Sequence, residues 1–149
     1  GCVDALTNLF RFRAPAEVLL QVQGPVLLLP QSMPQPDVAL IRARPHGYRR
    51  ERPRPADIIL LIEVCDSSFQ RDLRDKVPLY ARAGVPEVWL VHLAGQRLLR
   101  FLEPSGSEWR RTDVLTRGAS LAPVECPGAL LTIDEILGEP NPLPDDEPE

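Results

Sequence analysis

The chain has 149 residues, of which 44% are apolar and 26% are charged, and its formal net charge is −4. Its apolar runs fall well short of the roughly 20 residues that a membrane-spanning helix needs, so we expect no membrane role. Three widely separated cysteines support neither a disulfide framework nor a zinc site. The composition therefore indicates one globular domain in a reducing cytoplasm.

The first half of the chain predicts one helix and several strands. Apolar residues at helical spacing in "CVDALTNLF" predict a helix at the start. The segments "EVLLQVQ" and "PVLLL", on either side of Gly24 and Pro25, predict a hairpin, and "PDVALIR" predicts the next strand. The apolar run "IILLIEV" predicts a strand that is buried on both faces.

The second half predicts a principal helix, further strands and a short helix. "DLRDKVPLYARAGV" has apolar residues at helical spacing and Gly84 as its stop signal, and Pro78 must lie near its first turn or kink it. "EVWLVHL" and "RLLRFLE" predict two strands joined by a tight turn, followed by a weaker strand at "EWRRTDVL". In "TIDEIL", Thr132 and Glu135 have the spacing of a capping box. This order indicates an α/β fold, with a mixed sheet flanked by helices.

The chain is expected to form a single domain over residues 1–137 and a tail over residues 138–149. The tail is rich in proline and ends in "PLPDDEPE", so we expect it to be disordered. The four acidic residues of that final stretch account for the whole net charge, which leaves residues 1–144 neutral.

Arginine is concentrated in one segment, residues 42–54, where "RARPHGYRRERPR" holds six arginines and one glutamate. A local positive patch is typical of a site for an anionic partner such as DNA. The alternative is a solvated segment whose arginines only keep it soluble, and this is the favoured interpretation for an arginine-rich loop with no other signal beside it. The candidate contacts with nucleic acid are Arg49, Arg50, Arg52 and Arg54.

Glu63 is the residue that most needs an explanation, because an ionised carboxylate in a buried strand is costly unless it is paired or holds a metal. Asp37 opens an earlier strand, and the interval between the two allows a return strand alongside, so the two carboxylates can converge. Such a pair is a common way to hold Mg²⁺. Lys76 follows on the predicted helix, where its ammonium could contact a phosphate or the attacking water. The alternatives are a turn role for Asp37 and an ion pair with arginine for Glu63.

Two further residues are accessory candidates. Gln23 lies on an alternating strand and either points at the site or belongs to a polar outward face. Asp72 either joins the site or pairs with Lys76 four residues later, and we favour the pair.

Four segments, "PQPDVAL", "ADIILLIEVCDSS", "RDLRDKVPLYARAGVPEVWLVHL" and "VQGPVLL", resemble the Uma-type restriction endonucleases of bacteria, in the PD-(D/E)xK nuclease superfamily. The resemblance runs from about residue 3 to about residue 137. It implies a restriction-endonuclease-like core that hydrolyses DNA phosphodiester bonds with Mg²⁺ or Mn²⁺. Asp37 is similar to the first-motif aspartate, Glu63 to the second-motif acid and Lys76 to a displaced catalytic lysine.

Two departures from that pattern leave alternatives open. The superfamily places its lysine two residues after the second acid, where this chain has Cys65. Relatives also carry an upstream segment, so we expect that an N-terminal segment is missing here. The leading hypothesis is a metal-dependent endonuclease. The alternatives are an inactive nuclease-fold module that binds nucleic acid or a partner chain, and a homodimeric scaffold in which exposed strands such as "RLLRFLE" pair across a two-fold axis.

Overall fold

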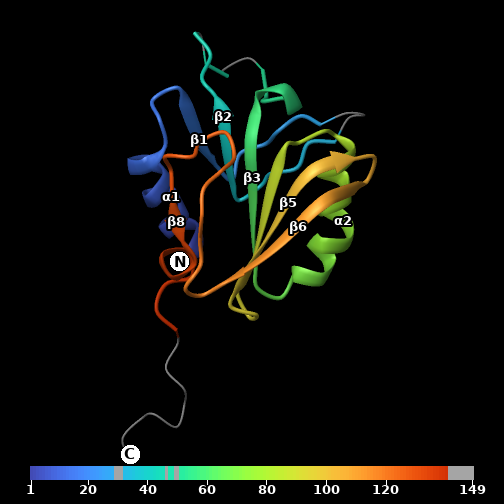
Figure 1. Cartoon of the computed structure of the whole chain (residues 1–149). Coiled ribbons are helices and arrows are strands. Elements are labelled where there is room, and N and C mark those ends of the chain that lie inside the picture. The colour runs from blue at the N-terminus through green and yellow to red at the C-terminus, as the bar shows by residue number, and fades with distance from the viewer. Residues whose placement is uncertain (29–31, 46, 49–50, 141–149) are drawn as a thin grey trace, which may run out of the picture.

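A six-stranded mixed sheet forms the centre of the protein, with its strands in chain order from β1 to β6 (Figure 1). The computed structural model describes all residues except 29–31, 46, 49–50 and 141–149. β3 and β4 run parallel, and the other neighbouring strands are antiparallel. The strands are β1 (Val18–Val22), β2 (Val38–Arg42), β3 (Ile58–Cys65), β4 (Glu87–His92), β5 (Arg97–Ser105) and β6 (Glu108–Thr116). The α-helices are α1 (Cys2–Arg13), α2 (Phe69–Arg82) and α3 (Ile133–Leu137).

The sheet carries apolar side chains on both faces because helices cover it on both sides (Figure 1). α1 and α3 cover one face, where they pack against residues that include Leu60 and Ile62 of β3. α2 covers the other face, where Tyr80 packs in one cluster with Leu61 and Cys65. The predicted α/β class, with a mixed sheet flanked by helices, is confirmed.

β3 is a central strand, and its buried apolar run follows from that position. Successive side chains of a strand point to opposite faces, so Glu63 lies on the α2 face together with Leu61 and Cys65. The side chain of Glu63 is almost entirely shielded from bulk water, because the residue is only 2% exposed. The fold therefore places one carboxylate inside the layer between β3 and α2.

α2 connects the two parallel strands and supplies the helical side of that layer. Gly84 follows the helix with φ of 80°, a left-handed conformation that glycine adopts without strain and that ends many helices. Pro78 lies inside the helix rather than in its first turn. Trp109 of β6 donates a hydrogen bond of 2.9 Å from Nε1 to the carbonyl oxygen of Val77, so β6 contacts the helix next to the proline.

The predicted hairpin around Gly24 is wrong. β1 pairs with β2, and Val22 lies opposite Val38. The segment after Pro25 instead runs over the sheet, with Val26 and Leu28 buried in the apolar cluster on the α2 face. The amides of Val26 and Leu28 donate to the carbonyl oxygens of Pro34 and Ser32 instead of to β1. The last residue of the predicted second strand lies outside the described residues.

The hypothesis that "RLLRFLE" is an exposed strand is also wrong. This segment is part of β5, which is paired with β4 on one side and with β6 on the other. The edges of the sheet are β1 and β6. Among the described residues, no helix is both long and apolar enough to cross a membrane.

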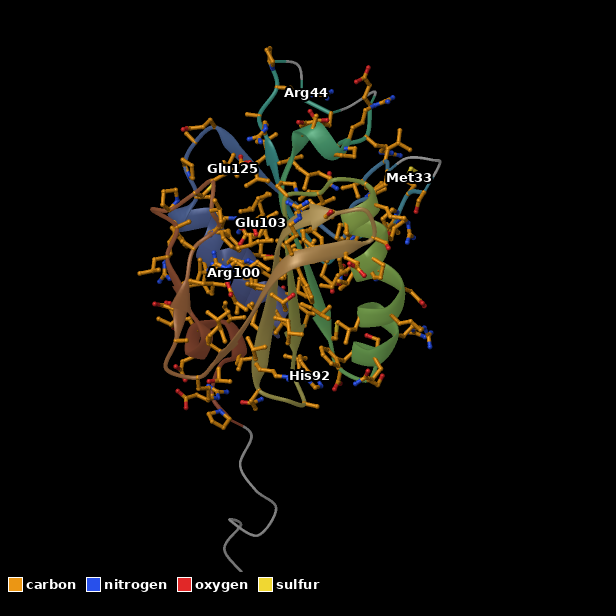
Figure 2. The ribbon with its side chains drawn as sticks, turned by 45° about the vertical axis from the view of Figure 1, so that its right-hand side comes forward. Met33, Arg44, His92, Arg100, Glu103 and Glu125 are labelled. Carbon is orange, nitrogen blue, oxygen red and sulfur yellow. The ribbon has the colours of Figure 1, made fainter. Side chains whose placement is uncertain are left out.

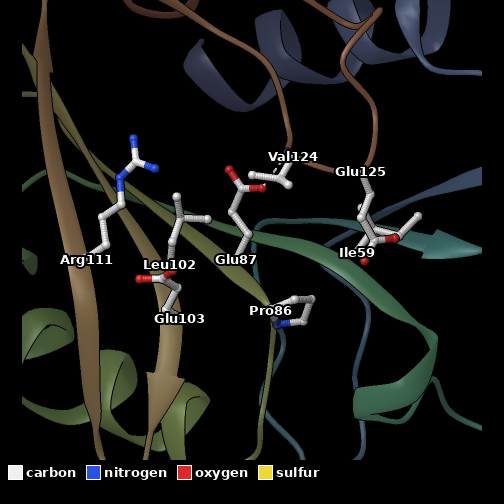
Figure 3. Close-up of a pocket in the computed structure, with 8 residues that line it drawn as sticks. All are labelled: Ile59, Pro86, Glu87, Leu102, Glu103, Arg111, Val124 and Glu125. Atoms are coloured by element: carbon white, nitrogen blue, oxygen red, sulfur yellow. Dashed lines mark hydrogen bonds between the residues drawn. The ribbon is translucent and has the colours of Figure 1, made fainter.

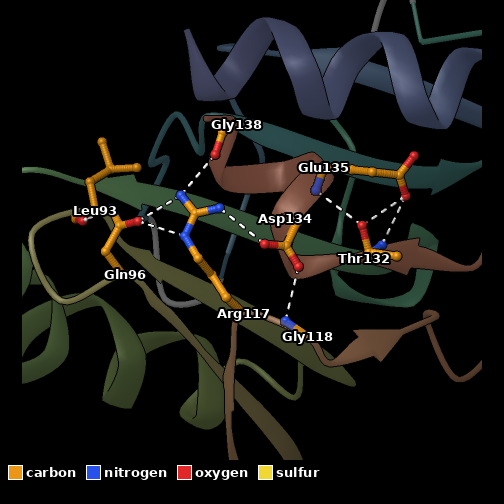
Figure 4. A network of polar contacts seen from close by, with 8 residues as sticks. All are labelled: Leu93, Gln96, Arg117, Gly118, Thr132, Asp134, Glu135 and Gly138. Atoms are coloured by element: carbon orange, nitrogen blue, oxygen red, sulfur yellow. Dashed lines mark hydrogen bonds and ion pairs between the residues drawn. The ribbon is translucent and has the colours of Figure 1, made fainter. Parts of the chain in front are cut away.

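The C-terminal segment is tied to the sheet by a polar network (Figure 4). Two short strands, β7 (Ser120–Leu121) and β8 (Leu131–Thr132), pair with each other before α3 begins. The guanidinium of Arg117 donates to Gln96, in the turn between β4 and β5, and forms an ion pair with Asp134 of α3 at 3.1 Å. Thr132 and Glu135 form the predicted capping box, with hydrogen bonds of 3.0 Å in both directions.

Candidate active site

The candidate site lies at the end of the sheet where β2 begins and where β3 and β4 finish. The antiparallel pairing of β2 with β3 brings Asp37, which precedes β2, to the level of Glu63. His92 ends β4 opposite Cys65, and its label marks this end of the sheet in Figure 2. The expected convergence of Asp37 and Glu63 is therefore produced by strand pairing.

Asp37 is held in place by the backbone of β3. Its Oδ2 accepts a hydrogen bond of 2.7 Å from the amide of Val64. The amide of Asp37 in turn lies 3.3 Å from Oε1 of Glu63. The two acidic residues are thus in direct contact through the backbone amide of Asp37. Val64 binds Oδ2 of Asp37, and Oδ1 is the other carboxylate oxygen.

Glu63 receives two donors from α2 on its other oxygen. The hydroxyl of Tyr80 donates to Oε2 at 2.6 Å, and Nζ of Lys76 lies 3.1 Å from the same atom. The side chain of Lys76 is 37% exposed, whereas Glu63 is buried, so Lys76 is the solvent-facing member of this ion pair. The displaced lysine does reach Glu63, as it must if it is to replace a lysine at position 65.

The environment of the site sets the charge of each group. Burial raises the pKa of Glu63 above its usual range, although the Tyr80 hydroxyl and the Lys76 ammonium act to lower it. Burial acts to lower the pKa of Lys76, but the charge and hydrogen bond of Glu63 outweigh it and the pKa is raised. Burial and the charge of Glu63 raise the pKa of Tyr80. At neutral pH Lys76 is therefore charged and Tyr80 protonated, so both act as donors.

Asp72 lies next to this ion pair, as the favoured interpretation of its spacing predicted. Its Oδ1 is 3.8 Å from Nζ of Lys76. Its Oδ2 accepts hydrogen bonds of 3.1 Å from the thiol of Cys65 and from the hydroxyl of Ser68. Burial, followed by the hydrogen bond to Asp72, raises the pKa of Cys65, so this side chain is a neutral donor.

Gln23, the other accessory candidate, follows β1 at the same end of the sheet. Its amide donates a hydrogen bond of 3.0 Å to the carbonyl oxygen of Asp37. The residue is exposed and has φ of 51°. Gln23 thus contacts the site residue through its backbone.

The basic loop lies at the opposite end of the sheet, because it connects the end of β2 to the start of β3. Figure 2 shows Arg44 of this loop at one end of the molecule and His92 at the other. Arg44 forms ion pairs with Glu51 and Asp57. Among the four arginines predicted to contact DNA, Arg52 and Arg54 are exposed on this loop, and Arg49 and Arg50 lie outside the described residues. The structure does not bring the described part of the loop to Glu63.

A pocket of about 270 Å³ also lies away from the candidate site, at the start of β4 (Figure 3). Glu87 is its buried carboxylate, and burial raises the pKa of this group. Its two oxygens accept hydrogen bonds from the amide of Val124 at 2.8 Å and from Nε1 of Trp89 at 2.7 Å. These bonds tie the start of β4 to Val124 and Trp89, which is a structural role for Glu87. The lining residues are Ile59, Pro86, Glu87, Leu102, Glu103, Arg111, Val124 and Glu125.

The donor set of the candidate site fits a divalent ion with few protein ligands. Among the described residues there is no group of three or more His, Cys, Asp or Glu side chains that could hold a metal. Mg²⁺, however, binds proteins through only one or two carboxylates and keeps several waters. Val64 holds Oδ2 of Asp37, and Tyr80 and Lys76 hold Oε2 of Glu63, while Oε1 of Glu63 accepts the longer bond of 3.3 Å from the amide of Asp37 and keeps a lone pair for a ligand. The second oxygens, Oδ1 of Asp37 and Oε1 of Glu63, are the atoms that would hold the ion.

Comparison with known proteins identifies the family. The model of the Uma2 family, whose description is "Putative restriction endonuclease", matches residues 2–134. The chain therefore belongs to the Uma2 family, as its motifs predicted, and this membership supports a nuclease. No curated protein matches the chain.

A solved structure confirms the fold. It is described as "a putative nuclease belonging to DUF820 from Anabaena variabilis ATCC 29413". The two chains are 13% identical and superpose with a TM-score of 0.68, and the match covers 91% of this chain and 75% of that chain. At this level of identity the likeness shows a shared fold.

Sequence reasoning missed the part that Tyr80 plays in the site. An aromatic residue at this helical spacing is typical of the core, and Tyr80 is fully buried, but its hydroxyl also binds Glu63. The signal was its position four residues after Lys76, which puts both on the same face of α2. A buried tyrosine usually needs a partner for its hydroxyl, and the buried acid of β3 was the available acceptor.

Proposed function

We propose that this protein is a metal-dependent endonuclease that hydrolyses phosphodiester bonds of DNA. The observation that carries the proposal is the meeting of Asp37, Glu63 and Lys76 at one end of the sheet, with the lysine supplied by α2. This arrangement offers two oxygens for a divalent ion and one ammonium for a phosphate. The cofactor in this proposal is Mg²⁺, or Mn²⁺ in its place.

Each residue has a distinct role in the proposed reaction. Asp37 and Glu63 hold the ion, which would activate the attacking water and offset negative charge on the phosphate. Val64 and Tyr80 fix the two carboxylates by hydrogen bonds, so that their remaining oxygens stay oriented toward the ion. Lys76 contacts a phosphate oxygen and stabilises the charge that develops there.

The alternative is a nuclease-fold module that binds nucleic acid without cleaving it. The observation in its favour is Cys65, a buried, neutral thiol at the position where the superfamily pattern has its lysine. The two functions differ in one respect that an assay can measure, namely whether DNA strands are broken.

Nicking of a supercoiled plasmid tests the proposal. Wild type is incubated with the plasmid in Mg²⁺ or Mn²⁺, beside an Asp37→Asn variant and a sample in EDTA. Asp37→Asn is the matched blank, because an amide oxygen can still accept the hydrogen bond of Val64 while the negative charge is lost. We expect nicking by wild type with metal and background rates in both controls. Equal rates in wild type and Asp37→Asn would reject the endonuclease and leave the binding module.

A further inference from the structure

Asp72 is a second buried carboxylate beside the candidate site, and its two oxygens have different surroundings. The residue is 7% exposed. Two neutral donors, the thiol of Cys65 and the hydroxyl of Ser68, bind Oδ2. Oδ1 faces the ammonium of Lys76 at 3.8 Å. The hydrogen bonds on Oδ2 therefore fix the orientation of the carboxylate, while Oδ1 forms the ion pair with Lys76.

Lys76 lies between two carboxylates that belong to different elements. Glu63 of β3 is the nearer partner, at 3.1 Å, and Asp72 of α2 is the farther one, at 3.8 Å. An ammonium on a flexible four-carbon stem can move between two such acceptors with little change in its backbone. If Glu63 binds a divalent ion, Lys76 loses the ion pair with its nearest carboxylate. Asp72 then remains one turn away on the same helix.

We propose that Asp72 is a positioning residue for Lys76: fixed by Cys65 and Ser68, its carboxylate retains the ammonium beside the site when a divalent cation takes over Glu63. This inference rests on the proposed nuclease function, and it gives Cys65 a part in the site. The thiol occupies the position of the superfamily lysine, but here it orients the acid that holds the replacement lysine. Direct contact with the metal or the DNA is assigned to Glu63 and Lys76, and Asp72 acts through Lys76.

A purely structural role for Asp72 makes a different prediction. The residue lies in the first turn of α2, where a negative charge is stabilised by the helix dipole. Loss of that interaction would lower stability whatever residue stands at position 76. A positioning role instead requires that the effect of changing Asp72 depends on the presence of Lys76. The two explanations are therefore separated by a double-mutant cycle.

The test is calorimetric Mn²⁺ binding to wild type, Asp72→Asn, Lys76→Met and the double variant. Without Asp72, Glu63 is the one carboxylate among the described residues that forms an ion pair with the ammonium, so a metal must displace Lys76 from Glu63 at greater cost. We expect Asp72→Asn to weaken Mn²⁺ binding by about tenfold, the scale of losing an outer-shell partner. In the Lys76→Met background the same change is expected to have an effect of less than about threefold, since the competing ammonium is gone. Asp75→Asn, at an exposed residue paired with Arg74, is the matched control and should bind like wild type.

Nicking kinetics provide a second readout. Asp72→Asn is expected to lower kcat by about 10- to 100-fold with the KM for DNA unchanged. Ser68→Ala, which removes one of the two donors to Oδ2, should shift both readouts in the same direction by a smaller factor. Circular dichroism of each variant checks that the fold is retained.

Each other outcome overturns the inference in an identifiable way. An equal loss of Mn²⁺ affinity in both backgrounds would mean that Asp72 acts independently of Lys76, through the fold or on the metal itself, and would overturn the positioning role. Wild-type binding and nicking by Asp72→Asn would remove its role while the nuclease function stands. A wild type that neither binds Mn²⁺ nor nicks DNA would overturn the proposed function itself, and this inference with it.

Discussion

The ammonium of Lys76 and the hydroxyl of Tyr80 meet at one atom, Oε2 of Glu63, at 3.1 and 2.6 Å. Both donors come from the same face of α2, one turn apart, while the acid comes from the middle layer of the protein on β3. Oε1 of Glu63 is left facing the amide of Asp37. The helix therefore determines which of the two oxygens is available on the side of Asp37.

Removing the ammonium of Lys76 should separate metal binding from catalysis. In Lys76→Met we expect nicking to fall by roughly 100-fold or more, the scale of losing one charged donor to the transition state. Mn²⁺ should bind at least as tightly as in wild type, because no ammonium competes for Glu63. Plasmid nicking and calorimetry measure the two effects. Unchanged nicking by Lys76→Met would exclude the displaced lysine from the reaction.

Removing the hydroxyl of Tyr80 should reduce both stability and activity. Tyr80→Phe leaves Oε2 of Glu63 with one donor fewer in a buried site, which costs about 1–3 kcal/mol in the free energy of unfolding. We expect nicking to fall by about tenfold, as for loss of a group that orients a metal ligand. Urea unfolding and plasmid nicking test this expectation. Tyr48→Phe is the control, because that hydroxyl binds the carbonyl oxygen of Arg42 at the other end of the sheet. Equal behaviour of the two variants would contradict the role of Tyr80.

The sequence predicted the acids of the site better than their surroundings. Glu63 stood out because a carboxylate in a buried strand requires a partner, and Asp37 because the interval between the two allowed adjacent strands. The side chains that join Glu63 from α2 depend on how the helix rotates over the sheet, and local pattern does not determine that rotation. The sequence alone therefore indicates only a packing role for Tyr80, although its helical spacing from Lys76 is visible in it.

The position of the basic loop relative to the site follows from strand direction. The sequence places the loop between the two strands that carry Asp37 and Glu63. Both residues, however, lie at the other ends of their strands, since Asp37 precedes β2 and Glu63 is near the end of β3. Strand direction thus separates the loop from the site by the length of β2. The wrong hairpin has a similar origin, because strand propensity after Pro25 was read without knowing that β2 would pair with β1.

The ion pair between Arg13 and Glu135 should make stability depend on acid pH. The hydrogen bond from Arg13, together with the amide of Thr132, lowers the pKa of Glu135 from 4.5 to about 2. A carboxyl whose pKa is lower in the folded state contributes stability above its unfolded pKa and loses it as pH falls through the folded value. Wild type should thus be more stable than Glu135→Gln at neutral pH, and the difference should shrink between pH 4.5 and about 2. Thermal unfolding of both proteins across this range measures it, and a constant difference would contradict the assignment.

The basic loop provides a prediction about where DNA lies. Each phosphate contact contributes about 0.9 to the slope of log affinity against log salt. If the loop binds the DNA backbone, changing Arg49, Arg50, Arg52 and Arg54 to serine should flatten this slope in a fluorescence titration. The four matched lysine substitutions keep the charge and should leave the slope nearly unchanged.

The nicking rate of the serine variant shows whether the loop acts in DNA binding alone or also in cleavage. The described part of the loop lies at the end of the sheet opposite Glu63, so Arg52 and Arg54 are not placed to contact the phosphate that is cleaved. We therefore expect the variant to need more DNA for half-maximal rate while its rate at saturating DNA stays at the wild-type level. An unchanged salt slope would assign the loop to solubility. Contacts that bind the substrate and the transition state equally change KM rather than kcat. A large fall in the rate at saturating DNA would therefore contradict the separation of the loop from the site.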